Sequence, residues 1–152
     1  MTSKDFCLAD NATTHTILKD KKYFQSLILC KANVNTISSS SNSIEGSKRA
    51  IIMLPKGIKL CIDDVLYSSK SSKNLLNFKD IRYNGYHIEI NNEGSEEFLY
   101  ITSIVSGQKL ILEKLPIFSS GLYCTTMRTV ETNVATCNTS EMFKPKGFYA
   151  LV

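Results

Sequence analysis

The sequence predicts a mainly β fold with one short helix, and three observations support this class. Several segments alternate apolar and polar residues, which is the period of a strand with one buried face. Turn-forming residues interrupt the chain about every 8 to 12 residues, a spacing typical of barrels and sandwiches. The chain has 152 residues, 43% of them hydrophobic, which suits a single domain with its own core.

The expected strands are short and rich in β-branched and aromatic residues. Four segments show this pattern: IKLCIDDVLY (58–67), GYHIEI (85–90), EEFLYITSI (96–104) and QKLILEKL (108–115). Turn signals occur in LPKG (54–57), NNEGSEE (91–97), VSGQ (105–108) and SSG (119–121). The serine-rich segment Ser39–Arg49 is predicted as a polar loop between strands.

One helix is expected, in SSKNLLNFKDIRYNG (71–85). Its apolar residues form an uneven helical stripe, and Gly85 is a suitable C-terminal stop. From Thr129 the chain loses periodicity and fills with Thr and Asn. Residues 129–152 are therefore expected to form a poorly structured C-terminal tail, although GFYALV (147–152) suits a last docked strand.

Charge and cysteine content narrow the functional classes. The net charge is +4, but the basic residues are scattered, so a nucleic-acid partner is not expected. The five cysteines are far apart, and His15 and His87 are remote from each other, so neither a metal nor another cofactor is expected. No signal peptide or membrane-spanning run is recognisable, so we expect an intracellular, cytoplasmic protein without a membrane partner.

One acid stands out, in CLADNATTH (7–15). An apolar strand ends at Asp10, and small polar residues follow it. Asp, Asn and Thr also form ordinary turns, because their side chains hydrogen-bond nearby backbone groups. The segment alone therefore leaves two interpretations, a carboxylate kept for chemistry or a turn aspartate.

The order of several blocks is more specific than the acid. The acid segment is followed by a hairpin built around a Gly, then by DDVLYSSKSSKNLLNFKDI (63–81), and later by GLY (121–123). This order, over Phe6–Tyr123, resembles the protease-like segment of copia-type LTR retrotransposon Pol polyproteins. The resemblance implies a retropepsin-like closed β-barrel in residues 1–128 and an aspartic endopeptidase, a hydrolase that works as a homodimer.

The resemblance also implies roles for the residues of the acid segment. Asp10 matches the catalytic acid, and the chain holds one copy of the motif, so a dyad needs Asp10 from two chains at a two-fold axis. The active-site loop matches four residues, two of them altered: Asn11 replaces a Ser or Thr and Ala12 a Gly, and Thr13 and Thr14 keep the usual character. His15 is expected either to pair with Asp10 or to be a partly exposed turn histidine.

A second matching region is the flap-like hairpin that closes over a polypeptide substrate. It corresponds to Ile44–Leu54, with Gly46, Ser47 and Lys48 at the flap tip. Lys48 stands where the family has the second Gly of a G-x-G pattern. This replacement predicts a stiffer and charged flap tip.

Two functions stay open at this stage. In the family the barrel leads into a zinc segment and an integrase, and this chain stops before both, as expected for a fragment of a transposable element. The first function is a dimeric endopeptidase that cleaves an extended peptide laid across the dimer cleft as an added strand. The alternative is a catalytically inactive β-barrel remnant that acts as a protein-interaction module or has no function. Which of the two functions holds depends on whether the replacements at Asn11 and Ala12 still allow catalysis.

Overall fold

The computed structural model describes residues 5–34 and 42–130 and confirms the mainly β class. Within these ranges there are ten strands, one α-helix and a short 3-10 helix. Their bounds are β1 (Phe6–Asp10), β2 (Ile17–Leu18), η2 (Lys21–Tyr23), β3 (Phe24–Val34), β4 (Asn42–Met53), β5 (Lys59–Tyr67), β6 (Asn74–Asn77), α1 (Phe78–Tyr83), β7 (His87–Glu93), β8 (Glu96–Val105), β9 (Gln108–Ser119) and β10 (Leu122–Thr126).

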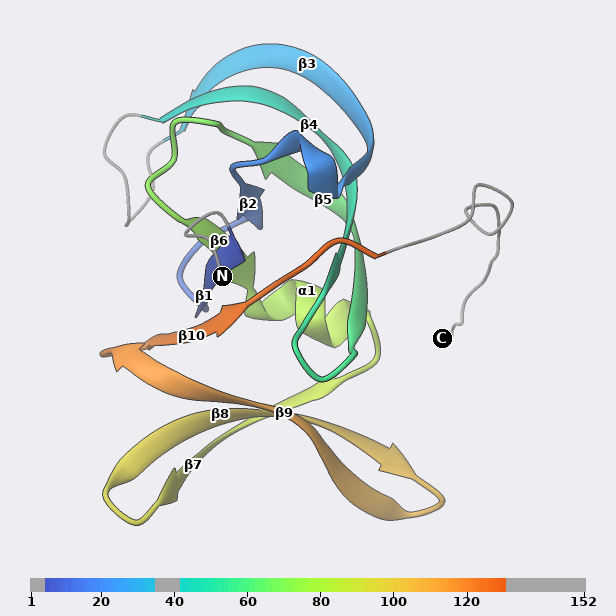
Figure 1. The fold of residues 1–152 in the computed structure, drawn as a ribbon, viewed down its shortest axis with the longest axis vertical. Helices are drawn as coiled ribbons and strands as arrows, with labels where there is room; N and C mark the ends of the chain where they lie inside the picture. The colour runs from blue at the N-terminus through green and yellow to red at the C-terminus, as the bar shows by residue number, and fades with distance from the viewer. Residues whose placement is uncertain (1–4, 35–41, 131–152) are drawn as a thin grey trace.

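All ten strands belong to one mixed sheet, in the order β3-β4-β5-β2-β6-β1-β10-β9-β8-β7. Most neighbours are antiparallel, but β1 pairs with β6, and β2 with β5, in parallel. In Figure 1, β3 and β4 arch across the top of the molecule, and the twisted β7–β9 strands lie at the bottom. The strand that ends at Asp10 is thus central in the sheet.

The expected closed barrel is not seen in the described residues, because β3 and β7 are the two edges of an open sheet. One isolated antiparallel bridge joins Met53, at the end of β4, to Arg128, which follows β10. In this bridge each N–H donates to the other residue's carbonyl at 2.9 Å. Closing a barrel needs a continuous ladder between its first and last strands, and a single bridged pair leaves the sheet open.

Two clusters of buried side chains lie on opposite faces of β1. The main core joins α1 to both parts of the sheet, since Ile81 clusters there with Leu60 of β5 and Leu99 of β8. The smaller cluster is formed by Leu8, Ile17 and Leu75. Because side chains alternate along a strand, Asp10 lies on the Leu8 face of β1, away from the main core.

The strand period and the turn signals are confirmed. Ile58, Leu60 and Ile62 are all buried, as the alternation predicted. Gly94 and Gly107 lie in the β7–β8 and β8–β9 turns with φ angles of 65° and 79°. These left-handed values are open to Gly at little cost, so both turns depend on residues that the sequence marks.

The predicted helix is correct only in its second half. Residues 74–77 form β6 between β1 and β2, and α1 begins at Phe78. Asn77 caps α1, since its side chain accepts a hydrogen bond from the N–H of Lys79 at 2.7 Å. Gly85 ends the helical segment as predicted, with a φ of 92° and its N–H bonded to the carbonyl of Arg82 at 2.9 Å.

The prediction of a polar loop in Ser39–Arg49 is wrong from Asn42 onward, where β4 begins. From Gly46 to Ala50, β4 is paired with both β3 and β5, and this pairing satisfies backbone groups that a loop would leave to water. The predicted tail, apart from residues 129 and 130, lies outside the described residues, and so does GFYALV.

A buried carboxylate fastens β9 to the turn between β4 and β5. Glu113 is 2% exposed, and its side chain accepts a hydrogen bond from the N–H of Lys56 at 2.6 Å. Burial raises the pKa of the Glu113 carboxyl, and the hydrogen bond from Lys56 opposes this rise. The ionised form is therefore less favourable in the folded chain than in the unfolded one.

This raised pKa predicts a pH-dependent effect of Glu113→Gln. Stability from a protonated Glu113 is present below the unfolded pKa, about 4.3, and is lost as pH rises through the raised folded pKa. The neutral amide of the variant still accepts from Lys56. Chemical denaturation between about pH 4 and about pH 8 should show the variant gaining stability relative to wild type as pH rises.

The exposed Glu96 provides the control for this experiment. The variant Glu96→Gln should show no comparable trend with pH. A difference between Glu113→Gln and wild type that stays constant across the pH range would contradict the assigned effect of burial.

Candidate functional site

Asp10 ends β1 in a buried position, with 3% of its surface exposed. On one side it lies opposite Asn77 of the parallel strand β6, and on the other opposite Leu122 of β10. Its Oδ1 accepts a hydrogen bond from the N–H of Ala12 at 2.8 Å. This bond turns the chain directly after the strand, as Asp commonly does.

The Asp10 carboxylate has unused acceptor capacity. Within residues 5–34 and 42–130, the N–H of Ala12 is the one hydrogen-bond donor that reaches it. An ionised carboxylate offers about four acceptor positions, and burying it without partners is costly. The site therefore suits a further hydrogen-bond donor, such as a water molecule or a protonated carboxyl group.

The residues after Asp10 form a tight loop on the surface. Asn11, Ala12 and Thr14 are exposed, whereas Thr13 is half-buried. The Thr13 hydroxyl donates to the carbonyl of His15 at 2.8 Å, and Thr14 Oγ1 lies 3.0 Å from His15 Nδ1. The loop is thus braced by its own side chains, and the four predicted loop residues lie together beside Asp10.

His15 pairs with Asp64, not with Asp10. Its Nε2 lies 3.2 Å from Asp64 Oδ2. Asp64 belongs to β5, where a bulge leaves both it and Asp63 exposed between Ile62 and Val65. The His15 and Asp64 side chains are 36% and 80% exposed, so the pair is a surface contact of small stabilising value.

Asn77 and Thr16 hold the loop from inside the protein. The Asn77 side-chain amide donates to the carbonyl of Thr13 at 2.6 Å, and the Asn77 N–H donates to Thr16 Oγ1 at 3.0 Å. The Thr16 hydroxyl donates to Asp80 Oδ2 at 2.6 Å. The sequence-based prediction placed Asn77 in the expected helix and assigned no role to it or to Thr16. Asn is disfavoured within a strand unless it has partners, but this signal becomes readable only once 74–77 is known to be a strand.

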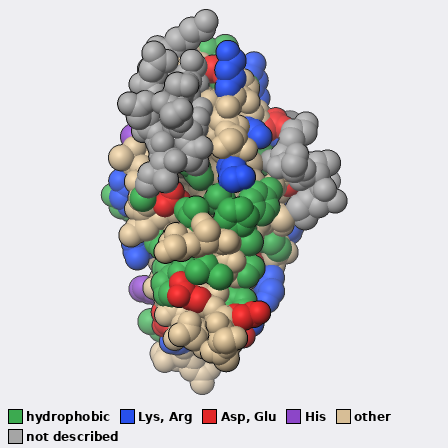
Figure 2. Space-filling view, turned by 90° about the vertical axis from the view of Figure 1, so that its left-hand side faces the viewer, with side chains coloured by type: hydrophobic (Ala, Val, Ile, Leu, Met, Phe, Trp, Pro, Cys, Tyr) green, Lys and Arg blue, Asp and Glu red, His purple; other side chains and the backbone are tan. Residues whose placement is uncertain are grey.

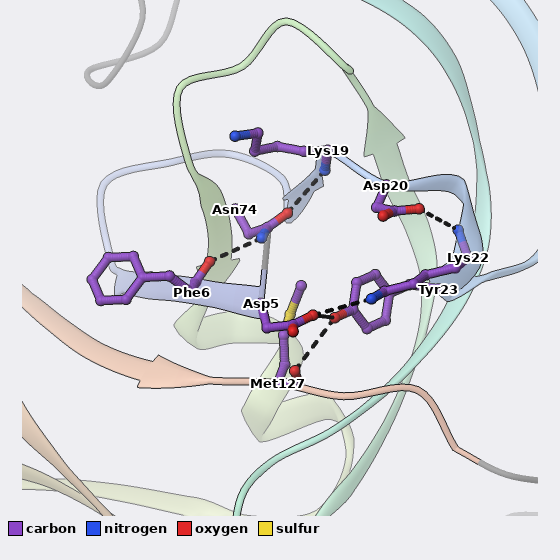
Figure 3. Close-up of polar contacts among 8 residues, drawn as sticks. All are labelled: Asp5, Phe6, Lys19, Asp20, Lys22, Tyr23, Asn74 and Met127. Carbon is purple, nitrogen blue, oxygen red and sulfur yellow. Dashed lines mark hydrogen bonds and ion pairs between the residues drawn. The ribbon is translucent and has the colours of Figure 1, made fainter. Parts of the chain in front are cut away.

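The other end of β1 is anchored by a second polar network (Figure 3). Asp5 Oδ1 accepts from the Tyr23 hydroxyl at 2.8 Å and from Lys22 Nζ at 3.1 Å. The Tyr23 hydroxyl also lies 3.3 Å from the carbonyl of Met127. Burial, followed by the hydrogen bond to Asp5, raises the pKa of Tyr23, so this phenol stays protonated and keeps donating.

Asn74 makes further hydrogen bonds near this end of β1 (Figure 3). Its amide donates to the carbonyl of Phe6 at 2.9 Å and its Oδ1 accepts from the N–H of Lys19 at 2.9 Å. One buried Asn of β6 therefore ties the first residue of β1 to the end of β2. The other, Asn77, ties the loop that follows the last residue of β1.

The predicted flap residues lie elsewhere in the sheet. Gly46, Ser47 and Lys48 sit inside β4, paired with both β3 and β5, and not at a hairpin turn. Residues 35–41, between β3 and β4, lie outside the described residues. In the sheet order, β5, β2 and β6 separate β4 from β1. The placement of the flap tip at Gly46–Lys48 is thus incorrect, because these residues continue a strand.

Other reactive groups of the described segments do not gather into a site. In residues 5–34 and 42–130 no group of three or more His, Cys, Asp or Glu side chains could hold a metal ion. Cys7 is buried, and burial raises its pKa to about 12, which makes it a poor nucleophile. Among the helices of the described residues, none is long and apolar enough to cross a membrane.

Comparison with known protein families, curated proteins and solved structures found no match to this chain. The function of the site must therefore be inferred from its own geometry. The distinctive feature is a buried carboxylate at a strand end, with open acceptor positions, followed by a loop that Asn77 holds through the Thr13 carbonyl.

The position of Gly46 predicts a cost for any side chain there. A Cβ at this residue would lie 2.9 Å from the carbonyl oxygen of Ile28 and 2.9 Å from Leu27 Cδ1. We expect Gly46→Ala to lower the free energy of unfolding by about 1–3 kcal/mol, since the paired strand must shift. Urea denaturation measures this, with Ser47→Ala as the neighbouring control. Equal stability of both variants would contradict the close approach.

Proposed function

We propose that this chain is a retropepsin-like domain of copia-type retrotransposon origin that hydrolyses peptide bonds. Asp10 is the catalytic acid, and two chains each contribute one. The observation that carries this proposal is the buried position of Asp10, at a strand end, with a single donor reaching it among the described residues. The order of sequence blocks around it supports the same proposal.

The proposed chemistry needs two carboxylates that share one proton. The ionised carboxylate takes a proton from a water molecule, whose oxygen attacks the carbonyl carbon of the peptide bond. The protonated carboxyl hydrogen-bonds the developing oxyanion, and the C–N bond then breaks as its nitrogen gains a proton. The acceptor positions left open on Asp10 leave room for the shared proton and the water.

The proposal includes the setting of the reaction. The retropepsin-like domain in residues 1–128 binds an extended polypeptide, needs no metal or other cofactor, and works in the cytoplasm without a membrane or nucleic-acid partner. Each chain supplies half of the dyad, so a monomer is inactive.

A second candidate function, that of a protein-interaction module, is favoured by exposed apolar side chains. Figure 2 shows hydrophobic side chains gathered in the middle of one face. On β9, Ile117 and Phe118 are 39% and 49% exposed. The Phe118 ring lies 5.7 Å from that of Phe6. Contiguous apolar surface of this kind is typical of binding sites for other proteins.

Asp10→Ala tests the peptidase directly. We expect the wild type at high concentration and mildly acidic pH to cut a mixed peptide library, and the variant to be slower by at least about a hundredfold. Cleavage products are measured by mass spectrometry. Asp63→Ala is the matched control, since Asp63 is 85% exposed and its contact is a surface pair with Arg49 at 3.4 Å.

Each outcome has a clear consequence. Loss of cleavage in Asp10→Ala but not in Asp63→Ala supports the proposal. Equal cleavage by Asp10→Ala and wild type rejects Asp10 as the acid. No cleavage by a folded wild type rejects the peptidase and leaves the interaction module.

A further inference from the structure

We infer that Asn77 is the positioning residue that sets the geometry of the Asp10 loop, an inference that rests on the proposed function. Asn77 is 4% exposed and ends β6, directly opposite Asp10 in the parallel ladder. Parallel strands end at the same edge of a sheet, so the chain leaves β1 and β6 side by side. From this place the Asn77 side chain reaches the loop that follows Asp10.

Three hydrogen bonds fix Asn77 itself. Its Nδ2 donates to the carbonyl of Thr13 at 2.6 Å, and its Oδ1 accepts from the N–H of Lys79 at 2.7 Å. Its backbone N–H donates to Thr16 Oγ1 at 3.0 Å. The amide is thus held at both ends, with one end on the start of α1 and the other on the loop. A buried amide in this state resists movement, because leaving a bond unmade is costly.

The contact with Thr13 controls the direction in which the chain leaves Asp10. Thr13 is three positions after Asp10, and the N–H of Ala12, between them, donates to Asp10 Oδ1 at 2.8 Å. If the Thr13 carbonyl is released, the segment that carries the Ala12 N–H can turn. The Asp10 carboxylate would then lose its donor and its fixed orientation, and catalysis depends steeply on such orientation.

A variant of Asn74 provides the control that distinguishes positioning of the Asp10 loop from general support of the sheet. It is also a buried Asn of β6, and its side chain makes hydrogen bonds of similar length to Phe6 and Lys19. Removing its amide should weaken the protein without touching the Asp10 loop. The pair Asn77→Ser and Asn74→Ser therefore compares the same chemical change at two buried sites of one strand.

The test uses the full chain and two kinds of measurement. Ser at position 77 still caps α1 but is too short to reach Thr13 as well. Amide hydrogen exchange of Ala12, followed by NMR, should accelerate by about tenfold in Asn77→Ser and stay within about twofold of wild type in Asn74→Ser. In peptide cleavage, Asn77→Ser should lower kcat by about tenfold with little change in KM. Asn74→Ser should leave both kcat and KM close to the wild-type values.

Asn77→Asp is a second variant, of equal size, that keeps the cap and loses the donor to Thr13. If both Asn77 variants fold and their Ala12 exchange matches wild type, the inference is wrong. Equal acceleration in Asn74→Ser would also overturn it, since general loosening would explain the effect. The exchange result does not need an active enzyme. Suppose that the wild type is inactive and that Ala12 exchange accelerates in the Asn77 variants but not in Asn74→Ser. This result rejects the proposed function and supports the positioning role of Asn77.

Discussion

The parallel pairing of β1 with β6 is the contact on which the rest of the site depends. It joins segments that are far apart in the sequence, in a ladder from Cys7 opposite Asn74 to Asp10 opposite Asn77. A parallel pair cannot be joined by a tight hairpin. The chain therefore forms β2 to β5 before it returns, and β2 ends up between β5 and β6. The loop after Asp10 begins the segment between β1 and β6, and β6 fixes the shape of this loop through Asn77.

The two ends of β1 are secured in different ways. At Asp5 a carboxylate, a phenol and an ammonium group form a network that also reaches Met127, after the last strand (Figure 3). At Asp10 the carboxylate itself has one donor among the described residues, and the neighbouring backbone is held instead. This difference suits an acid that must be oriented and still be open to a further partner. In the proposed dimer that partner comes from the second chain.

Much of the β structure could be predicted from local pattern, because buried and exposed residues alternate in β5 and glycines mark the turns at Gly94 and Gly107. The error at β6 arose because Leu75, Leu76, Phe78 and Ile81 also fit a helical stripe. The start of β4 was missed because its Ser and Asn residues favour loops, and pairing with β3 from Asn42 onward overrides that preference. Closure of the sheet and the residue opposite Asp10 both depend on contacts between distant segments. The alternation of apolar and polar residues along the sequence cannot reveal such contacts. For Asp10 the strand end and the turn were predictable, but the role of Asn77 was not.

The most direct test of the account is the dependence of cleavage rate on protein concentration. One acid per chain implies that activity belongs to a dimer. The initial rate of peptide hydrolysis should then rise with the square of the chain concentration when most chains are monomers, and become proportional to it when dimers predominate. A rate proportional to concentration throughout, from chains that sedimentation shows to be monomeric, would contradict a shared dyad of two Asp10 residues.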